Sequence, residues 1–82
     1  MNYNNNELDK KTLEFYKRIG NNVKRARQQK DISQMQLAQL LNYKSTSSIS
    51  NPKVCYNKHH FSIGQLYKIS LVLEIDIKSL LD

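Results

Sequence analysis

Residues 32–49 read ISQMQLAQLLNYKSTSSI and contain the clearest helix signals of the chain. Ser33, followed three residues later by Gln36, is the pattern of a capping box, in which each side chain bonds the backbone N–H of the other residue at a helix start. Apolar residues then recur on one side of a short helix: Leu37, Ala38, Leu40 and Leu41. Asn42 suits the left-handed conformation in which many helices end. The stretch therefore opens with a short, well-delimited helix.

A second short helix is predicted directly after the first. Ser45 can cap a helix that begins at Thr46, and Ile49 supplies one inward-facing apolar residue. Pro52 confines this helix to residues 46–50, because a proline beyond the first turn removes a hydrogen bond and clashes with the turn before it. Two short helices joined by a tight turn form a helix-turn-helix, in which one helix rests on a duplex backbone while the other enters the major groove.

A long helix is predicted before this pair. Apolar residues at helical spacing extend over residues 7–30, and we expect these side chains to face inward: Leu8, Phe15 or Tyr16, Ile19, Val23 and Ala26. Residues 1–6 are Asn-rich and are predicted to form a flexible terminus.

Two further helices are predicted after the pair. Ser62 caps one whose inward-facing residues are Ile63, Leu66, Ile69, Ser70 and Leu73. Asp76 caps a short final helix over residues 77–81. We therefore expect an all-α fold, a single compact five-helix domain over residues 7–82 with an extended first helix.

The chain is basic, with thirteen Lys and Arg against seven Asp and Glu and a net charge of +6. The placement of the charges is more informative than their sum. Residues 10–30 hold eight cations and a single acid, Glu14, and residues 32–73 hold no acid. A surface that faces phosphates requires a region free of negative charge, whereas the plainer interpretation is a solvated, lysine-rich face.

The same composition bears on where the protein acts. No stretch is long and apolar enough to span a bilayer, and the N-terminus lacks the pattern of a signal peptide. The single cysteine cannot form an internal disulfide, which is typical of a reducing compartment. We expect a cytoplasmic protein.

Several polar residues lie where a helix-turn-helix would meet a duplex. Ser33, Gln34 and Ser45 are at helix starts, where free N–H groups and the helix dipole favour an anion. The side chains of Gln34 and Lys44 can reach phosphates from there. Small polar residues occupy the exposed start of the second short helix and the positions beside it: Thr46, Ser47, Ser48, Ser50 and Asn51.

The runs IGNNVKRARQQKDISQMQLAQLLNYKSTSSIS (residues 19–50) and FSIGQLYKISLVLEIDIKSLL (residues 61–81) resemble the Cro and phage-repressor type of helix-turn-helix protein, the XRE family. The resemblance implies a lambda-repressor-like fold that binds double-stranded DNA. It also implies that Gln34 and Ser45 bind phosphates.

The base-reading residues implied by the resemblance depend on register. If Ile49 is the buried residue of the second short helix, the family's base-reading positions fall on Thr46, Ser47 and Asn51. If Ile49 matches a later isoleucine of the family motif, they fall on Thr46 and Ser48.

The chain departs from the family in the segment after Ile49. The family continues with Ile-Glu-Asn-Gly, and the Glu pairs with an Arg late in the first helix. Residues 51–54 here are NPKV, so Arg27, which matches that Arg, has no such Glu. We expect Arg27 either to face solvent and phosphate or to bond a carbonyl. Lys53, in this segment, is a further candidate for phosphate contact.

Other kinds of site find little support in the sequence. Cys55, His59 and His60 are the only clustered candidates for metal ligands, and a fourth ligand is not evident, so neither a metal nor a cofactor is predicted. Nothing places a nucleophile beside a base, which argues against an enzyme. The first helix needs its apolar stripe for the core, which argues against a membrane-surface helix.

The predicted function is that of a transcription regulator, a repressor that binds operator DNA as a homodimer. Leu71, beside Leu80 and Leu81, is the candidate two-fold contact. The alternative is the antitoxin of a toxin-antitoxin pair, which binds operator DNA and also a protein toxin. A third hypothesis, an interaction module that has lost DNA binding, is disfavoured by the acid-free middle of the chain.

Overall fold

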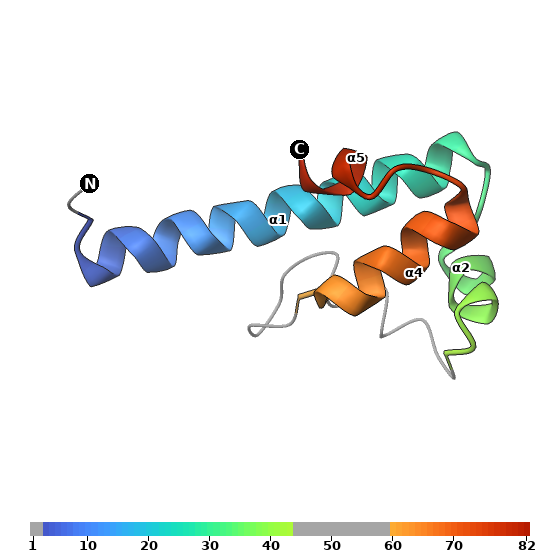
Figure 1. The fold of residues 1–82 in the computed structure, drawn as a ribbon, viewed down its shortest axis with the longest axis horizontal. Coiled ribbons are helices and arrows are strands. Elements are labelled where there is room, and N and C mark those ends of the chain that lie inside the picture. The colour runs from blue at the N-terminus through green and yellow to red at the C-terminus, as the bar shows by residue number, and fades with distance from the viewer. Residues whose placement is uncertain (1–2, 44–59) are drawn as a thin grey trace.

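A computed structural model describes residues 3–43 and 60–82 of the chain. These residues form four helices, α1 (Asn5–Gln29), α2 (Gln34–Leu40), α4 (Ile63–Leu73) and α5 (Lys78–Leu81), and no strand (Figure 1). The predicted all-α class is confirmed for the described residues. The predicted count of five helices is not, and the helix expected over residues 46–50 lies outside the described part.

The long helix α1 begins earlier than predicted. Asn4 is its N-cap: the side-chain oxygen accepts a hydrogen bond from the Glu7 N–H at 2.8 Å, and the side-chain amide donates to the Glu7 carboxylate at 3.0 Å. Asn5 and Asn6 are therefore helical rather than part of a flexible terminus, because the Asn-rich start supplies its own cap. The helix continues unbroken through Gly20.

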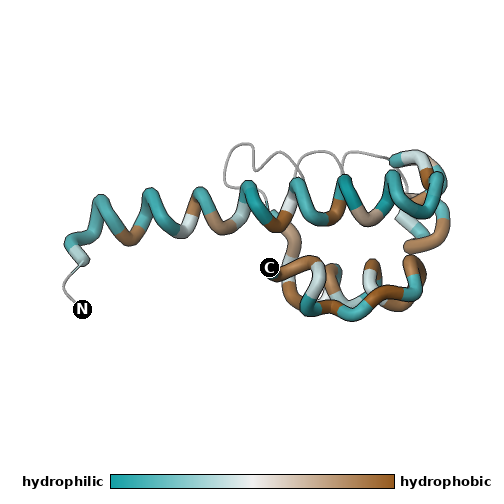
Figure 2. Tube along the Cα trace, turned by 90° about the horizontal axis from the view of Figure 1, so that it is seen from above, coloured by the Kyte–Doolittle hydropathy of each residue, from teal (hydrophilic) through white to brown (hydrophobic). Residues whose placement is uncertain are grey.

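Only the C-terminal half of α1 contributes to the core. α4 and α5 lie beside this half, and the N-terminal half extends past them (Figures 1 and 2). Ile19 and Val23 are buried as predicted, whereas Leu8 is 47% exposed and Phe15 36%. Of the alternatives Phe15 and Tyr16, Tyr16 is the half-buried one. The prediction that Leu8 faces inward is wrong, because the apolar stripe runs on beyond the helices that cover it.

The other helices supply the rest of the core. Its buried apolar members are Leu37, Ala38 and Leu41 near α2, Phe61 before α4, Leu66, Ile69 and Leu73 on α4, and Leu80 on α5. Ser70 is also buried. Four of the five residues predicted to face inward on α4 therefore do so, and the exception is Ile63, which is 68% exposed. Ile63 lies four and eight residues before Tyr67 and Leu71, so it shares their exposed flank of the helix.

Local signals define both ends of α4. Ser62 and Gln65 form a capping box at its start, with hydrogen bonds of 2.9 and 3.1 Å. At its end Glu74 adopts a left-handed conformation with φ 56°, as Asp31 (57°) and Asn42 (61°) do after α1 and α2. Each of the three helices thus ends by turning the chain through one left-handed residue that is not glycine.

The C-terminus is held against α1. The predicted cap Asp76 accepts a hydrogen bond from the Lys78 N–H at 2.9 Å, and α5 begins at Lys78, one residue later than predicted. The buried side-chain amide of Asn22, on α1, donates to the carbonyls of Leu80 at 3.1 Å and Asp82 at 2.7 Å. These bonds tie the last turn of the chain to the middle of α1.

Candidate nucleic-acid interface

The start of α2 is built by a capping box. Ser33 Oγ accepts from the Gln36 N–H at 3.1 Å, and Gln36 Oε1 accepts from the Ser33 N–H at 2.8 Å, as predicted. Because Gln36 is committed to the cap, two other side chains are left at this helix start, those of half-buried Gln34 and of Met35, which is 62% exposed. Gln34, the predicted phosphate ligand, is therefore in the first turn of α2 without a part in the cap.

Arg27 makes two hydrogen bonds with Ile32 across the turn between α1 and α2. Its backbone carbonyl accepts from the Ile32 N–H at 3.1 Å, and its guanidinium Nη1 donates to the Ile32 carbonyl at 2.7 Å. Arg27 is only 8% exposed, and its Nε is buried without a hydrogen-bond partner. Of the two arrangements expected for Arg27, the structure has the carbonyl bond, and the guanidinium is turned inward rather than toward solvent.

Buried apolar side chains on one side of α2 anchor this helix to the core. Leu37 and Leu41 are buried together with Ala38, whereas Leu40 is 52% exposed. The apolar side predicted for this helix is thus narrower than the sequence pattern suggested, because Leu40 faces a groove that it lines with Leu71 of α4. The buried side chains of Leu37 and Ala38 on α2, and of Leu41 directly after it, belong to the common core.

The end of α2 turns the chain sharply. Asn42 has φ 61°, as predicted, and the Tyr43 N–H donates to the Ala38 carbonyl at 2.8 Å. The chain therefore leaves the helix within two residues and leads directly to the predicted contact residues. Most of these lie outside the described residues: Lys44, Ser45, Thr46, Ser47, Ser48, Ser50, Asn51 and Lys53.

No protein-family model, curated protein or solved structure matches this chain. The geometry of α2 and its two turns is therefore the basis for a functional assignment.

Only one of the three candidate metal ligands is among the described residues. Cys55 and His59 lie outside the described residues, and the exposed His60 ring stacks on Tyr16 of α1, with ring centroids 4.0 Å apart and planes 5° from parallel. Within residues 3–43 and 60–82, no three His, Cys, Asp or Glu side chains are grouped as a metal site would need. In the same residues, no helix combines the length and apolar character that crossing a membrane requires.

Sequence reasoning missed two contacts that position these elements. The Ser62–Gln65 box has the same spacing as Ser33–Gln36, so the signal was present in the sequence. The bonds from Asn22 to the C-terminal carbonyls had no signal, because they join residues about sixty positions apart.

Proposed function

We propose that this chain is a sequence-selective, double-stranded DNA-binding protein of the Cro and phage-repressor type, with a lambda-repressor-like fold, which acts in the cytoplasm as a transcriptional repressor. The observation that carries the proposal is the construction of α2. It is a short helix, capped at its start, anchored through one narrow side and ended by a left-handed Asn42 just before a hydroxyl-rich, acid-free segment. That is how the first helix of a helix-turn-helix sits ahead of its recognition helix.

The proposed contact residues form two groups, those that position the protein on the duplex and those that read base edges. Gln34, Lys44, Ser45 and Lys53 meet phosphates and set the register on the duplex. Base edges are met by small side chains, namely Thr46, Ser47, Ser48, Ser50 and Asn51. Arg27 is removed from the phosphate set, because its guanidinium is buried and bonded to Ile32.

The small size of the proposed base-reading side chains limits how strongly they can discriminate between bases by direct contact. Strong direct readout comes from Arg on guanine or from Asn and Gln on adenine, at about 1–3 kcal/mol for each bidentate pair. Among the proposed readers only Asn51 can make such a pair. Discrimination by direct contact is therefore shallow, and groove shape supplies much of the rest.

Selection of bound sequences from a random duplex pool tests the proposal. We expect a consensus to emerge, and binding to weaken with salt at a log–log slope of about −3 to −6 per protomer pair, because each neutralised phosphate contributes about −0.9. An unselected pool together with a slope near zero would overturn DNA binding. Profiles for Ser47→Ala and Asn51→Ala then show which residue reads which base.

The antitoxin of a toxin-antitoxin pair remains the second candidate. It is favoured by apolar side chains left uncovered on the projecting half of α1, where Leu8 is 47% exposed and Leu13 42%. A protein toxin would bury them. Recovery of a stoichiometric toxin with the tagged protein from its native cell would support this candidate, and recovery of the protein without one would count against it.

A further inference from the structure

Six cations on α1 form two straight rows. Positions seven residues apart lie two turns apart on nearly the same side of a helix, with a drift of about 20° per step. The lysine row is Lys10, Lys17 and Lys24, and the second row is Lys11, Arg18 and Arg25. All six side chains are exposed. At 1.5 Å per residue each row extends about 21 Å along α1.

The two rows differ in what their members contact. In the second row the Lys11 Nζ lies 5.8 Å from the ring centroid of Tyr3, and the Arg18 guanidinium carbon lies 5.4 Å from that of Phe15. Arg25 lines a groove that is also lined by Asp76. Among residues 3–43 and 60–82, the lysine row makes no hydrogen bond or cation–π contact, whereas Lys11 and Arg18 of the second row each lie over a ring.

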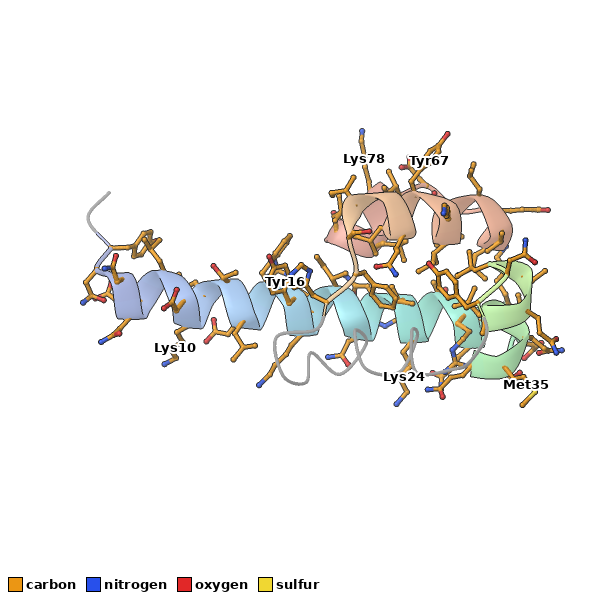
Figure 3. All side chains as sticks on the ribbon, turned by 90° about the horizontal axis from the view of Figure 1, so that it is seen from below. Lys10, Tyr16, Lys24, Met35, Tyr67 and Lys78 are labelled. Carbon is orange, nitrogen blue, oxygen red and sulfur yellow. The ribbon has the colours of Figure 1, made fainter. Side chains whose placement is uncertain are left out.

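The lysine row also shares a side of the molecule with the start of α2. Lys10 and Lys24 point away from α4 and α5, on the side toward which Met35 points from the first turn of α2, whereas Lys78 and Tyr67 point the opposite way (Figure 3). The acids near the row are Glu7, Asp9 and Glu14 at its N-terminal end and Asp31 in the turn after α1, and residues 15–30 contain none. The row therefore lies on the side toward which Met35 points at the start of α2, and its charge is least compensated between Glu14 and Asp31.

We infer that the lysine row binds the sugar–phosphate backbone of the same duplex, alongside the contact made by the start of α2. This inference rests on the proposed function and adds a second binding site to it. Over about 21 Å a duplex presents about twelve phosphate charges, at one per 1.7 Å of its axis, so three ammonium groups in a row find phosphates without any particular base sequence. An anionic membrane fits less well, because the apolar face of α1 is buried from Ile19 onward and cannot enter a bilayer.

Charge-matched variants test the inference. The triple variant Lys10→Gln, Lys17→Gln, Lys24→Gln is compared with Lys11→Gln, Arg18→Gln, Arg25→Gln, since each removes three charges from the same helix. The probe is a random-sequence duplex of about 30 base pairs, which is longer than either row. For each bound protomer, we expect the lysine-row variant to flatten the log–log salt slope by about 2 to 3, at about 0.9 for each lost phosphate contact, and the control to change it by less than about 1. Thermal unfolding of both variants checks that the fold is kept.

Three outcomes would overturn the inference. Equal flattening in both variants would mean that overall charge matters and not the row, and an unchanged slope in both would mean that α1 is away from the duplex. The third is vesicle binding: if wild type binds vesicles with anionic lipid, and the lysine-row variant loses this binding but keeps the wild-type salt slope on the duplex, the row is assigned to a membrane. The proposed function is judged separately, by whether wild-type protein binds DNA at all.

Discussion

Glu74 holds a left-handed backbone conformation, with φ 56° and ψ 48°, at an exposed position where α4 ends. A residue with a Cβ loses about 1–2 kcal/mol in this conformation, which glycine adopts freely. We expect Glu74→Gly to raise the free energy of unfolding by about 0.5–1 kcal/mol, since the greater entropy of glycine in the unfolded chain offsets part of the gain. Urea denaturation measures the difference.

Asn42 is the matched control for this substitution. It has φ 61° at the end of α2, but asparagine tolerates the left-handed region better than glutamate does. Asn42→Gly should therefore stabilise the protein less than Glu74→Gly. A loss of stability in Glu74→Gly would show that the glutamate makes a compensating interaction. The difference between the two residues also explains why the turn at Asn42 was predictable from sequence and that at Glu74 was not.

At the scale of elements, α1 is one helix with two environments. Ile19 is 4% exposed and Leu8 47% exposed, although both lie on the same apolar stripe. We expect Ile19→Ala to lower the free energy of unfolding by about 2–4 kcal/mol, because it leaves a cavity in the core. Leu8→Ala should change it by less than about 0.5 kcal/mol, as an exposed substitution does. A cost for Leu8→Ala close to that of Ile19→Ala would mean that the projecting half of α1 is covered in solution.

The junction of α1 and α2 offers a test of where Arg27 acts. Arg27→Met keeps a side chain of similar length but removes the donor to the Ile32 carbonyl, so we expect a loss of about 1–3 kcal/mol in unfolding free energy. The salt slope of DNA binding should stay the same, because the buried guanidinium meets no phosphate. Lys44→Ala is the comparison, with an expected flattening of about 1. Flattening of that size in Arg27→Met would place the guanidinium at the duplex after all.

Helix boundaries were predictable because their signals are local. The side chains that cap α2 and α4 lie within three residues of the N–H groups they bond, so the sequence carries the whole interaction. Burial was less predictable, since it depends on which element lies opposite. Leu8, Leu40 and Ile63 fit a helical apolar pattern yet are exposed, because the described helices that could cover them lie elsewhere.

For the whole molecule, the sequence predicted an all-helical fold that contains a helix-turn-helix. The described residues confirm the first of the two short helices of this motif, α2. The base-reading residues proposed between Lys44 and Lys53 stay a prediction. Of the residues predicted to form a two-fold patch, Leu80 is fully buried and Leu81 half-buried, whereas Leu71 is exposed and lines a groove with Leu40, Leu41 and Val72. Such neighbours come from tertiary packing, to which sequence spacing gives no access. The two-fold contact itself stays a prediction.

This groove is nevertheless the best candidate for a two-fold contact. Leu71 is 58% exposed and Leu40 52%, and Tyr67, one turn before Leu71, is 56% exposed. A single small module buries too little surface for tight specific binding, so DNA-binding domains of this kind engage two half-sites about one helical turn apart as dimers. We therefore predict that Leu71→Glu shifts the protein toward monomer in sedimentation and weakens operator binding, because it places a charge where two apolar surfaces meet. Leu8→Glu is the control, with the same charge on another exposed leucine, in the projecting half of α1. The opposite result, in which Leu8→Glu dissociates the dimer and Leu71→Glu leaves it intact, would place the interface on the exposed apolar stripe of α1. The distance between the two half-sites would then be set by α1 and not by α4.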